Sequence, residues 1–508
     1  MRNSKPFLAI GVCALLFSSP AAAEIEFDFG AFVENDLRVE VDHVDEPGIG
    51  RNQTSLGGDL KVDLLPDKLR FVGDIQFVWT GYTRDTEFEG LTTREKVSPY
   101  YLESRAAYIE VLSLVPTLDM RVGRQIVHWG AADMFNPTNN LNAVDLEDPL
   151  MFGDTIANEM IRLDWAPNDN FIITGAWVPV FQPAMLPRSA LLGVGDTASE
   201  FPFVRPKVRR DAERLRNIWL RRPDSYAIEQ PTLTAEMPEF SLANSQFGMR
   251  VIWTAGLFDM SLSYFQGYDT LPVPVLSKSS THSTDELSPE GAPKIGVSTD
   301  VQLVYPKKKV AGFDFTGQVP FLDDAGIWFE GAFVFPERIE MDFDVREVVP
   351  GSDPIRGETV EKRPFFKCTT GMDYTINDYF FITGQYIHGF VDEFGASKQG
   401  DYWMGALDTK LLQERLLLRF VMLGEIPKDD DDLSLDDDGD GQIESDARGA
   451  TYSGTISSYI IYPQVTVKPI DGLELTLIGY FSLGHTESKF AQPAAGPSLV
   501  VFRARASF

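Results

Sequence analysis

Apolar and polar residues alternate with a period of two along most of this chain. Near its end, Leu473, Leu475 and Leu477 alternate with Glu474 and Thr476. The same alternation recurs in three further segments: 69–80, 311–319 and 327–335. Successive side chains of a β-strand point to opposite faces, so each segment predicts a strand with one face suited to hydrocarbon and one suited to water.

The last residues form the clearest of these strands. One face of this strand is apolar and consists of Phe502, Ala504, Ala506 and Phe508. The other face is polar and consists of Arg503, Arg505 and Ser507. A terminal strand of this kind, ending on an aromatic residue, is typical of a barrel that spans the outer membrane. The apolar face would then contact lipid and the arginines would face a watery interior.

Short and long connections alternate between the predicted strands. The short turns fall at 65–68, 115–117, 167–170, 322–325, 377–379 and 471–472. The long polar segments fall at 43–53, 84–100, 131–158, 182–243, 271–298, 340–362, 428–451 and 486–496. This is the asymmetry of periplasmic turns and extracellular loops. We predict an all-β fold, an antiparallel transmembrane barrel of about eighteen strands with sixteen as the alternative, in which residues 25–38 pair with the last strand.

The amino-terminal residues predict export. Residues 1–23 combine basic Arg2 and Lys5, an apolar run and small residues before Glu24, which indicates a cleaved signal peptide. Residues 24–508 would then form a single barrel domain with long insertions at 131–158 and 182–243 and an acidic loop at 428–451. Cys368 would be the only cysteine of the mature chain, so no intramolecular disulfide is expected.

Composition narrows the class further. The net charge of −30 argues against nucleic-acid binding. A hydrophobic fraction of 44% with 12% aromatic residues argues against disorder. No run of 18 or more apolar residues follows the signal, so we do not expect a membrane-spanning helix.

The signal peptide, the even set of amphipathic strands and Phe508 resemble Gram-negative porins and their uncharacterised porin-like relatives. The segment 122–130, VGRQIVHWG, is similar to a strand of poorly characterised outer-membrane barrels. The resemblance implies a multi-pass barrel in the outer membrane, in contact with lipid and lipopolysaccharide. It also implies that the barrel-assembly machinery recognises Phe508. Because the first predicted strand begins close to Glu24, we expect no plug domain before it, and we expect a channel for passive or gated diffusion of small polar or amphiphilic solutes.

The alternation also predicts which side chains line the pore. The candidates are Arg70, Asp74, Arg121, Arg162, Asp164, Asp314, Glu330, Arg419, Glu474, Arg503 and Arg505. Both signs are present, so these charges would either set a field across the pore or only pair with one another. Arg124 falls on the lipid-facing parity, and we expect a bulge at Gly123 to turn it inward.

Two long segments carry sharper hypotheses. Segment 131–158 is rich in amides and turn formers, and it would either fold into the lumen as a constriction, with Asn136, Asn139, Asn140 and Asp145 toward the solute, or cap the rim as a surface loop.

Segment 182–243 holds a basic run in which Arg209, Arg210, Arg214 and Arg216 accompany an apolar helical stripe ending at Trp219. This helix would act as a gate in the lumen, dock a partner or lipopolysaccharide, or pack on the rim.

The acidic loop resembles a calcium-binding loop. Asp436, Asp438 and Asp440 occupy alternate positions before Gly441. The twelfth position is Ala447 instead of glutamate, and no flanking helices are expected. A weak calcium site in residues 436–446 and a merely acidic loop are the two alternatives, and no cofactor is required.

The remaining function classes are an enzyme and a docking barrel. The five histidines lie outside any recognisable nucleophile motif, so no enzymatic activity is expected, although a barrel lipase would scatter its triad over several strands. The stronger rival is a non-conducting structural or docking barrel of a secretion, adhesion or motility complex. The sequence does not choose between a monomer and a homotrimer.

Overall fold

The computed structural model describes most of the chain after the predicted signal. The described residues are 25–42, 48–81, 94–151, 153–186, 225–229, 232–344, 346–347, 351, 355–396, 399–426, 457–484, 488–491 and 496–508. All structural statements below concern these residues.

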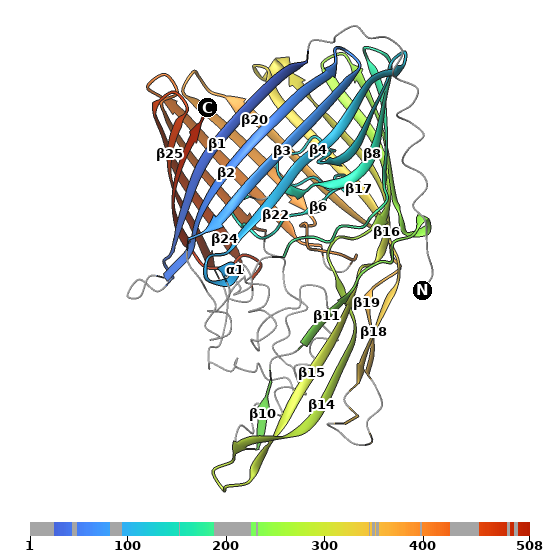
Figure 1. The fold of residues 1–508 in the computed structure, drawn as a ribbon, viewed down its shortest axis with the longest axis vertical. Helices are drawn as coiled ribbons and strands as arrows, with labels where there is room; N and C mark the ends of the chain where they lie inside the picture. Colours follow the sequence, from blue (N-terminus) through green and yellow to red (C-terminus); the bar gives the residue numbers. More distant parts are fainter. Residues whose placement is uncertain are drawn as a thin grey trace.

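Eighteen antiparallel strands form one closed sheet, which confirms the predicted fold and strand number (Figure 1). In ring order they are β1 (Glu26–Glu40), β2 (Gly48–Leu65), β3 (Leu69–Thr80), β4 (Tyr100–Val115), β5 (Leu118–Gln125), β8 (Asn158–Asn168), β9 (Phe171–Val178), β12 (Gln246–Ala255), β13 (Phe258–Tyr268), β16 (Lys307–Val319), β17 (Ala325–Pro336), β20 (Phe365–Thr375), β21 (Phe380–His388), β22 (Asp401–Leu411), β23 (Leu416–Glu425), β24 (Ser458–Ile470), β25 (Leu473–Gly484) and β26 (Leu499–Ser507).

The first and last strands close the ring, as the sequence predicts. β1 pairs with β26 from Phe32 opposite Ser507 to Glu40 opposite Leu499. The backbones of Ala31 and Phe508 add two reciprocal hydrogen bonds of 2.9 Å each. Closure leaves the barrel without a free strand edge, which a bilayer requires because lipid offers no hydrogen-bond partners.

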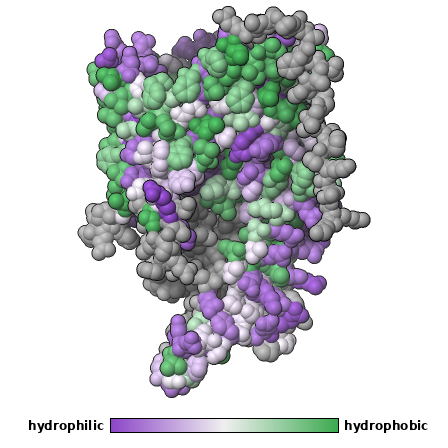
Figure 2. Space-filling model, viewed as in Figure 1, coloured by the Kyte–Doolittle hydropathy of each residue, from purple (hydrophilic) through white to green (hydrophobic). Residues whose placement is uncertain are grey.

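The two faces of the wall differ as the alternation predicts. On β25, Leu475 and Leu477 are each 44% exposed, whereas Ile478 and Tyr480, which point to the other face, are buried. Figure 2 shows hydrophobic groups over much of the visible face of the barrel. Since the protein has water-avoiding groups outside and charged groups inside, its outer face is suited to lipid. Among the described residues, no helix has the length and apolarity needed to cross a bilayer.

A second sheet projects beyond the barrel and corrects part of the sequence prediction. Its six strands are β10 (Tyr226–Ile228), β11 (Thr232–Glu236), β14 (Val273–Leu287), β15 (Pro293–Val304), β18 (Ile339–Asp344) and β19 (Ile355–Val360), at the end of the barrel with the long connections (Figure 1). We expected only polar loops in segments 271–298 and 340–362 and in this part of 182–243. The prediction failed because both faces of the hairpin are polar: the neighbours Ser279 and Ser280 bond to Thr299 and Ser298 on opposite faces, at 3.1 and 2.9 Å. Such a hairpin shows no alternation of apolar and polar residues.

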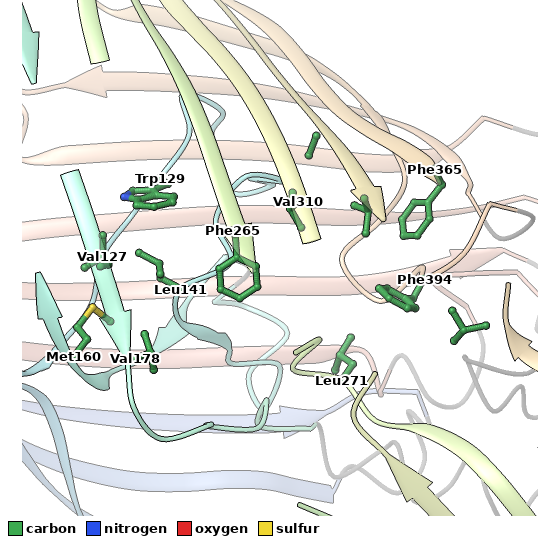
Figure 3. Close-up of a cluster of buried hydrophobic side chains, with 14 of the residues drawn as sticks. Val127, Trp129, Leu141, Met160, Val178, Phe265, Leu271, Val310, Phe365 and Phe394 are labelled. Carbon is green, nitrogen blue, oxygen red and sulfur yellow. The ribbon is translucent and has the colours of Figure 1, made fainter. Parts of the chain in front are cut away.

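Between β5 and β8 the chain leaves the wall and folds into the barrel. We call residues 126–157 the inner segment; it contains the two-residue strands β6 (Ala143–Val144) and β7 (Thr155–Ile156). Its Val127, Trp129 and Leu141 are buried against wall residues such as Met160 and Phe265, as Figure 3 shows. The short helices α1 (Arg94–Val97), η4 (Leu242–Asn244) and η5 (Pro320–Leu322) lie in connections.

Candidate pore and constriction

The predicted pore-lining side chains all lie on the inward parity of their strands. On β8, Arg162 and Asp164 are partly buried, while the alternate residues Leu163 and Trp165 are 39% and 44% exposed on the outer face. The same pattern assigns the inner face to the whole predicted set: Arg70, Asp74, Arg121, Arg162, Asp164, Asp314, Glu330, Arg419, Glu474, Arg503 and Arg505.

One wall carries a row of paired charges across β2 to β5. Arg70 Nε lies 2.7 Å from Asp63 Oδ1, and its Nη1 lies 3.4 Å from Glu110 Oε2. The buried Glu110 also binds Arg121, with Nε to Oε1 at 2.7 Å. Directly opposite residues on neighbouring strands are close enough to pair, so the row follows from the register of the sheet.

The row continues around the wall. Arg162, which stands opposite Arg121, pairs with Asp164 at 2.9 Å, so the two guanidinium groups are each balanced by a separate carboxylate. On the next strands, Arg250 Nη2 lies 2.9 Å from Asp314 Oδ1. Asp314 is only 3% exposed, and it therefore contacts protein groups more than water.

The strands on the other side of β2, from β1 back to β22, pair their charges in the same way. The pairs are Arg503 with Asp36 at 2.7 Å, Arg505 with Glu34 at 3.3 Å, Arg419 with Asp408 at 3.3 Å and Lys468 with Glu474 at 2.8 Å. Arg505 also lies over the ring of Phe32, 3.8 Å from its centroid. Balanced pairs of this kind lower the cost of lining the lumen with charge, and their exposed edges still contact water.

Arg124 corrects a further prediction. The register of β5 with both neighbours runs without interruption through Gly123 and Arg124, so no bulge turns the arginine inward. Arg124 stays on the outer face, where Nη1 lies 2.9 Å from Glu159 and Nε donates to the carbonyl oxygen of Ser104 at 2.8 Å. The bulge lies on β4 instead, at Arg105. The ion pair and the carbonyl contact offset the cost of a charge on this face, and Figure 2 shows hydrophilic groups interrupting the hydrophobic surface of the barrel.

Glu330 of β17 fixes the inner segment to the far wall. Its carboxylate is fully buried and accepts five hydrogen bonds from the segment. Oε2 accepts from the backbone of Ala131 and Ala132 and from Asn136 Nδ2 at 3.0–3.1 Å, and Oε1 accepts from the backbone and hydroxyl of Thr138 at 2.8 Å. A buried carboxylate needs such donors, because unsatisfied charge in the interior is costly.

Gly130 allows this close approach. Its φ of +105° is a conformation that side chains rarely adopt, and a Cβ at this position would overlap the Glu330 carboxylate. Glycine is thus required at the point where the inner segment reaches β17.

Asparagine side chains hold the inner segment in its folded shape. Asn142 accepts from the backbone of Val127 at 2.8 Å and donates to the carbonyl oxygens of Gln125 and Ile156. The predicted constriction residue Asn139 accepts from the backbone of Trp129 at 3.4 Å, and Asn140 donates to the carbonyl oxygen of Pro137 at 3.0 Å. Some of the hydrogen bonds of these amides are therefore made within the inner segment itself.

Two aspartates anchor the inner segment to the first strands. Arg38 of β1 binds Asp148 through both terminal guanidinium nitrogens, and Arg51 adds a contact of 3.2 Å. Arg105, at the bulge of β4, binds Asp154 at 2.8 and 3.0 Å. Burial alone would raise the pKa of Asp148 and of Asp154, but their arginine partners hold both pKa values below the usual value.

Asp145, a further predicted constriction residue, takes a structural position in the inner segment. Its Oδ1 accepts from the backbone of Glu147 at 2.9 Å, and its backbone bonds to Asp154. Burial raises the pKa of Asp145, and neighbouring carboxylates add to that shift.

A cavity that opens to solvent lies between the inner segment and β16, β17 and β20. The predicted constriction residues Asn136, Asn139 and Asn140 line it. Lys308 and Lys367 also line it, together with apolar side chains that include Leu271, Phe365 and Phe394. Neither lysine is among the residues predicted from the sequence. Their inward positions on the strands could have indicated them, but the cavity that brings them together is also formed by the inner segment.

Several predicted residues lie outside the described residues. These are the proposed gate or docking residues Arg209, Arg210, Arg214, Arg216 and Trp219, and the calcium candidates Asp436, Asp438 and Asp440. Phe508, the predicted assembly signal, is described; its ring is 74% exposed on the outer face.

The closed wall of eighteen strands, its apolar outer face and its charged interior define a transmembrane β-barrel of the outer-membrane type. Residues 35–393 match the model of the family described as "Protein of unknown function (DUF1302)", and the chain belongs to that family. No curated protein matches the chain.

Similar solved structures include OccAB3 of Acinetobacter baumannii, with 8% sequence identity, a TM-score of 0.49 and coverage of 95% of this chain and 99% of that one. OpdQ of Pseudomonas aeruginosa gives 8% identity and a TM-score of 0.48, with coverage of 95% and 97%. The outer membrane protein OprD of the same organism gives 8% and 0.46, with coverage of 95% and 92%.

Proposed function

We propose that this protein is an outer-membrane channel for passive or gated diffusion of small polar or amphiphilic solutes, with the inner segment as its constriction. The observation that carries the proposal is the attachment of the inner segment across the lumen. The segment starts at β5, reaches Glu330 on β17 and is tied back to β1 by Arg38 and Asp148. A wide barrel needs such a structure inside it if it is to select among solutes.

The lining supports a path for polar solutes. Arg70, Arg121, Arg419 and Arg505 keep 33–39% of their side chains exposed while paired with carboxylates. A solute with donors and acceptors can exchange hydrogen bonds with water for bonds to these groups at small cost. We also propose that segment 182–243 acts as a gate, and only its basic helical sequence pattern supports this role.

Permeation measurements test the proposal directly. Liposomes that contain the purified barrel should swell in sugars, amino acids and organic anions, with a rate that falls as solute size increases. Planar bilayers should show discrete conductance steps. Deletion of residues 186–240 should raise permeation if that segment acts as a gate, and unchanged permeation would reject the gate while leaving the channel intact.

A docking barrel is the second candidate, and the projecting sheet of β10, β11, β14, β15, β18 and β19 favours it. This sheet extends beyond the lipid-facing wall, where a partner could reach it (Figure 1). A barrel that remains silent in bilayers and co-purifies with other envelope proteins would support docking over permeation.

A further inference from the structure

We propose that the outer wall at β13, β16 and β17 binds an anionic lipid of the outer leaflet, with its phosphate at Lys307 and Lys309 and one acyl chain over Ala311. The inference goes beyond the proposed channel function, because it concerns the lipid-facing side of the wall and not the lumen. Its test is therefore independent of permeation.

Two lysines of β16 face outward at the end of the barrel with the long connections. Lys307 and Lys309 are exposed, whereas Lys308 between them lines the inner cavity. Alternate residues of a strand lie about 7 Å apart, so both ammonium groups can reach one phosphate.

The charge of Lys309 has no acidic partner in the sheet. Its opposite neighbours are Gln266 on β13 and Phe335 on β17, and both are neutral. Glu337 lies at Lys307 instead, where its carboxylate accepts a hydrogen bond from the backbone at 3.3 Å. Among the described residues, no carboxylate forms an ion pair with either lysine. A phosphate would supply the counter-charge and accept charge-assisted hydrogen bonds.

An apolar strip continues along the wall from Lys309. The next outward residue of β16, Ala311, is small and stands opposite Tyr264 of β13 and Phe333 of β17. These two aromatic residues are 39% and 55% exposed, and their strands lie about 10 Å apart, which is twice the spacing of neighbouring strands. The strip between the two aromatic side chains is therefore suited to one acyl chain that starts next to the lysines.

A turn on the outer side of the wall lies beside the lysines. We call residues 237–245 the rim turn, and Figure 1 shows it in green next to the barrel wall. Its Asn244 accepts hydrogen bonds from the hydroxyl of Tyr268 at 2.7 Å and from Lys307 Nζ at 3.5 Å. Tyr268 has the same outward parity on β13 as the exposed Tyr264, so these bonds hold the rim turn on the lipid side.

The rim turn exposes large apolar side chains. Phe240 and Leu242 are 77% and 83% exposed, and Phe247, which follows the turn on β12, is 46% exposed on the outer face. Apolar groups exposed to this degree indicate a contact surface. Because this surface is continuous with the lipid-facing wall, we assign acyl chains as its partner.

Native mass spectrometry of the purified barrel tests the inference with phosphatidylglycerol and with phosphatidylcholine that has the same acyl chains. We expect the wild type to retain phosphatidylglycerol at least about fivefold better, and Lys309→Met to lower this preference about fivefold, as one charge at an anionic surface provides. Lys410→Met is the matched control. It removes the same charge from a lysine that is 52% exposed and paired with Glu414, and it should leave the preference unchanged.

The apolar half is tested by two further variants. Ala311→Trp should fill the strip and weaken retention of both lipids. Phe240→Ser should also weaken both, because it removes an acyl-chain contact of the rim turn. Phe321→Ser is its control, since Phe321 is 85% exposed in η5 at the other end of the barrel, and lipid selection should not change.

Three outcomes would overturn the inference. The first is equal retention of the two lipids by the wild type. The second is the same preference in Lys309→Met and Lys410→Met. The third is a second copy of the chain in place of lipid, seen as a lipid-free dimer that Phe240→Ser dissociates.

Discussion

Arg38 of the first strand and Asp148 of the inner segment form an ion pair through both nitrogens and both oxygens, with Nη1 to Oδ1 at 2.7 Å and Nη2 to Oδ2 at 2.5 Å. Arg38 also binds Asp36, which in turn binds Arg503 of the last strand. The anchor of the inner segment therefore lies at the seam where the barrel closes. Closure of the ring and placement of the constriction are coupled through this cluster.

Removing one partner of this pair should loosen the inner segment. We expect Asp148→Asn to cost about 3 kcal/mol locally, because it removes the bidentate partner of the buried Arg38 and leaves this arginine with Asp36, which it shares with Arg503. Hydrogen exchange of the amides in residues 141–156 should speed up, and channel noise should rise. Asp408→Asn serves as the control, since its arginine partner is 39% exposed and the exchange of the segment should not change.

Glu330 should be the second point on which the inner segment depends. In the native protein both oxygens of Glu330 accept hydrogen bonds. In Glu330→Gln, an NH₂ group replaces one of these oxygens and faces the same donors, so at least one hydrogen bond is lost. We expect a local cost of about 2 kcal/mol. Proteolysis within residues 131–140 measures the effect, and Glu474→Gln, at a half-exposed pair, should be silent. Equal protection in both variants would show that Glu330 does not hold the segment.

Gly130→Ala should destabilise the same contact by another route. The positive φ and the overlap with Glu330 together predict a cost of about 1–3 kcal/mol. Gly175 provides the control, because a Cβ there would meet no atom within 4 Å. Thermal unfolding monitored by tryptophan fluorescence should separate the two variants, and a neutral Gly130→Ala would mean that the backbone can move away from β17.

Acid should release the inner segment. The pKa values of Asp148 and Asp154 are lowered in the folded state, so their contribution is present above the unfolded pKa and is lost as pH falls through the folded pKa. Protease protection of the segment should hold from pH 7 to 5 and decline below about pH 4. The raised pKa of Asp145 acts in the opposite direction, and Asp145→Asn removes that contribution. Loss of protection between pH 7 and 5 would point to other groups.

Phe508 should act in assembly through its ring. Phe508→Ala keeps the backbone hydrogen bonds to Ala31, so refolding in detergent should match the wild type. Insertion in cells should fall if the assembly machinery recognises the aromatic group. Equal amounts of folded barrel in cell envelopes would reject this role.

The sequence predicts the barrel wall well, because the alternation of apolar and polar residues within each strand shows which face contacts lipid. The alternation of Leu475 and Leu477 with polar residues predicts β25, and the same argument predicts the inward side of Arg503 and Arg505. The strands of the projecting sheet show no such alternation, because Ser279 and Ser280 present polar groups to both faces.

The sequence alone does not predict contacts between residues that are far apart in the chain. The amides of residues 131–158 predict a constriction, but nothing local pairs Thr138 with Glu330 or Asp148 with Arg38. The burial of Lys367 likewise cannot be predicted from β20 alone, because its ammonium bonds to the carbonyl oxygen of Phe390, which lies between β21 and β22. Arg124 was misplaced because its partner Glu159 lies on another strand.

Cysteine modification during bilayer recording tests the central claim most directly. In a Cys368→Ser background, Asn140→Cys places a thiol on the cavity side of the inner segment, and Leu262→Cys places one on the outer face, where Leu262 is 53% exposed. A charged thiol reagent should reduce the conductance of the Asn140→Cys channel and leave that of Leu262→Cys unchanged. A barrel without conductance steps, or one whose current is indifferent to modification at residue 140, would contradict a channel constricted by the inner segment.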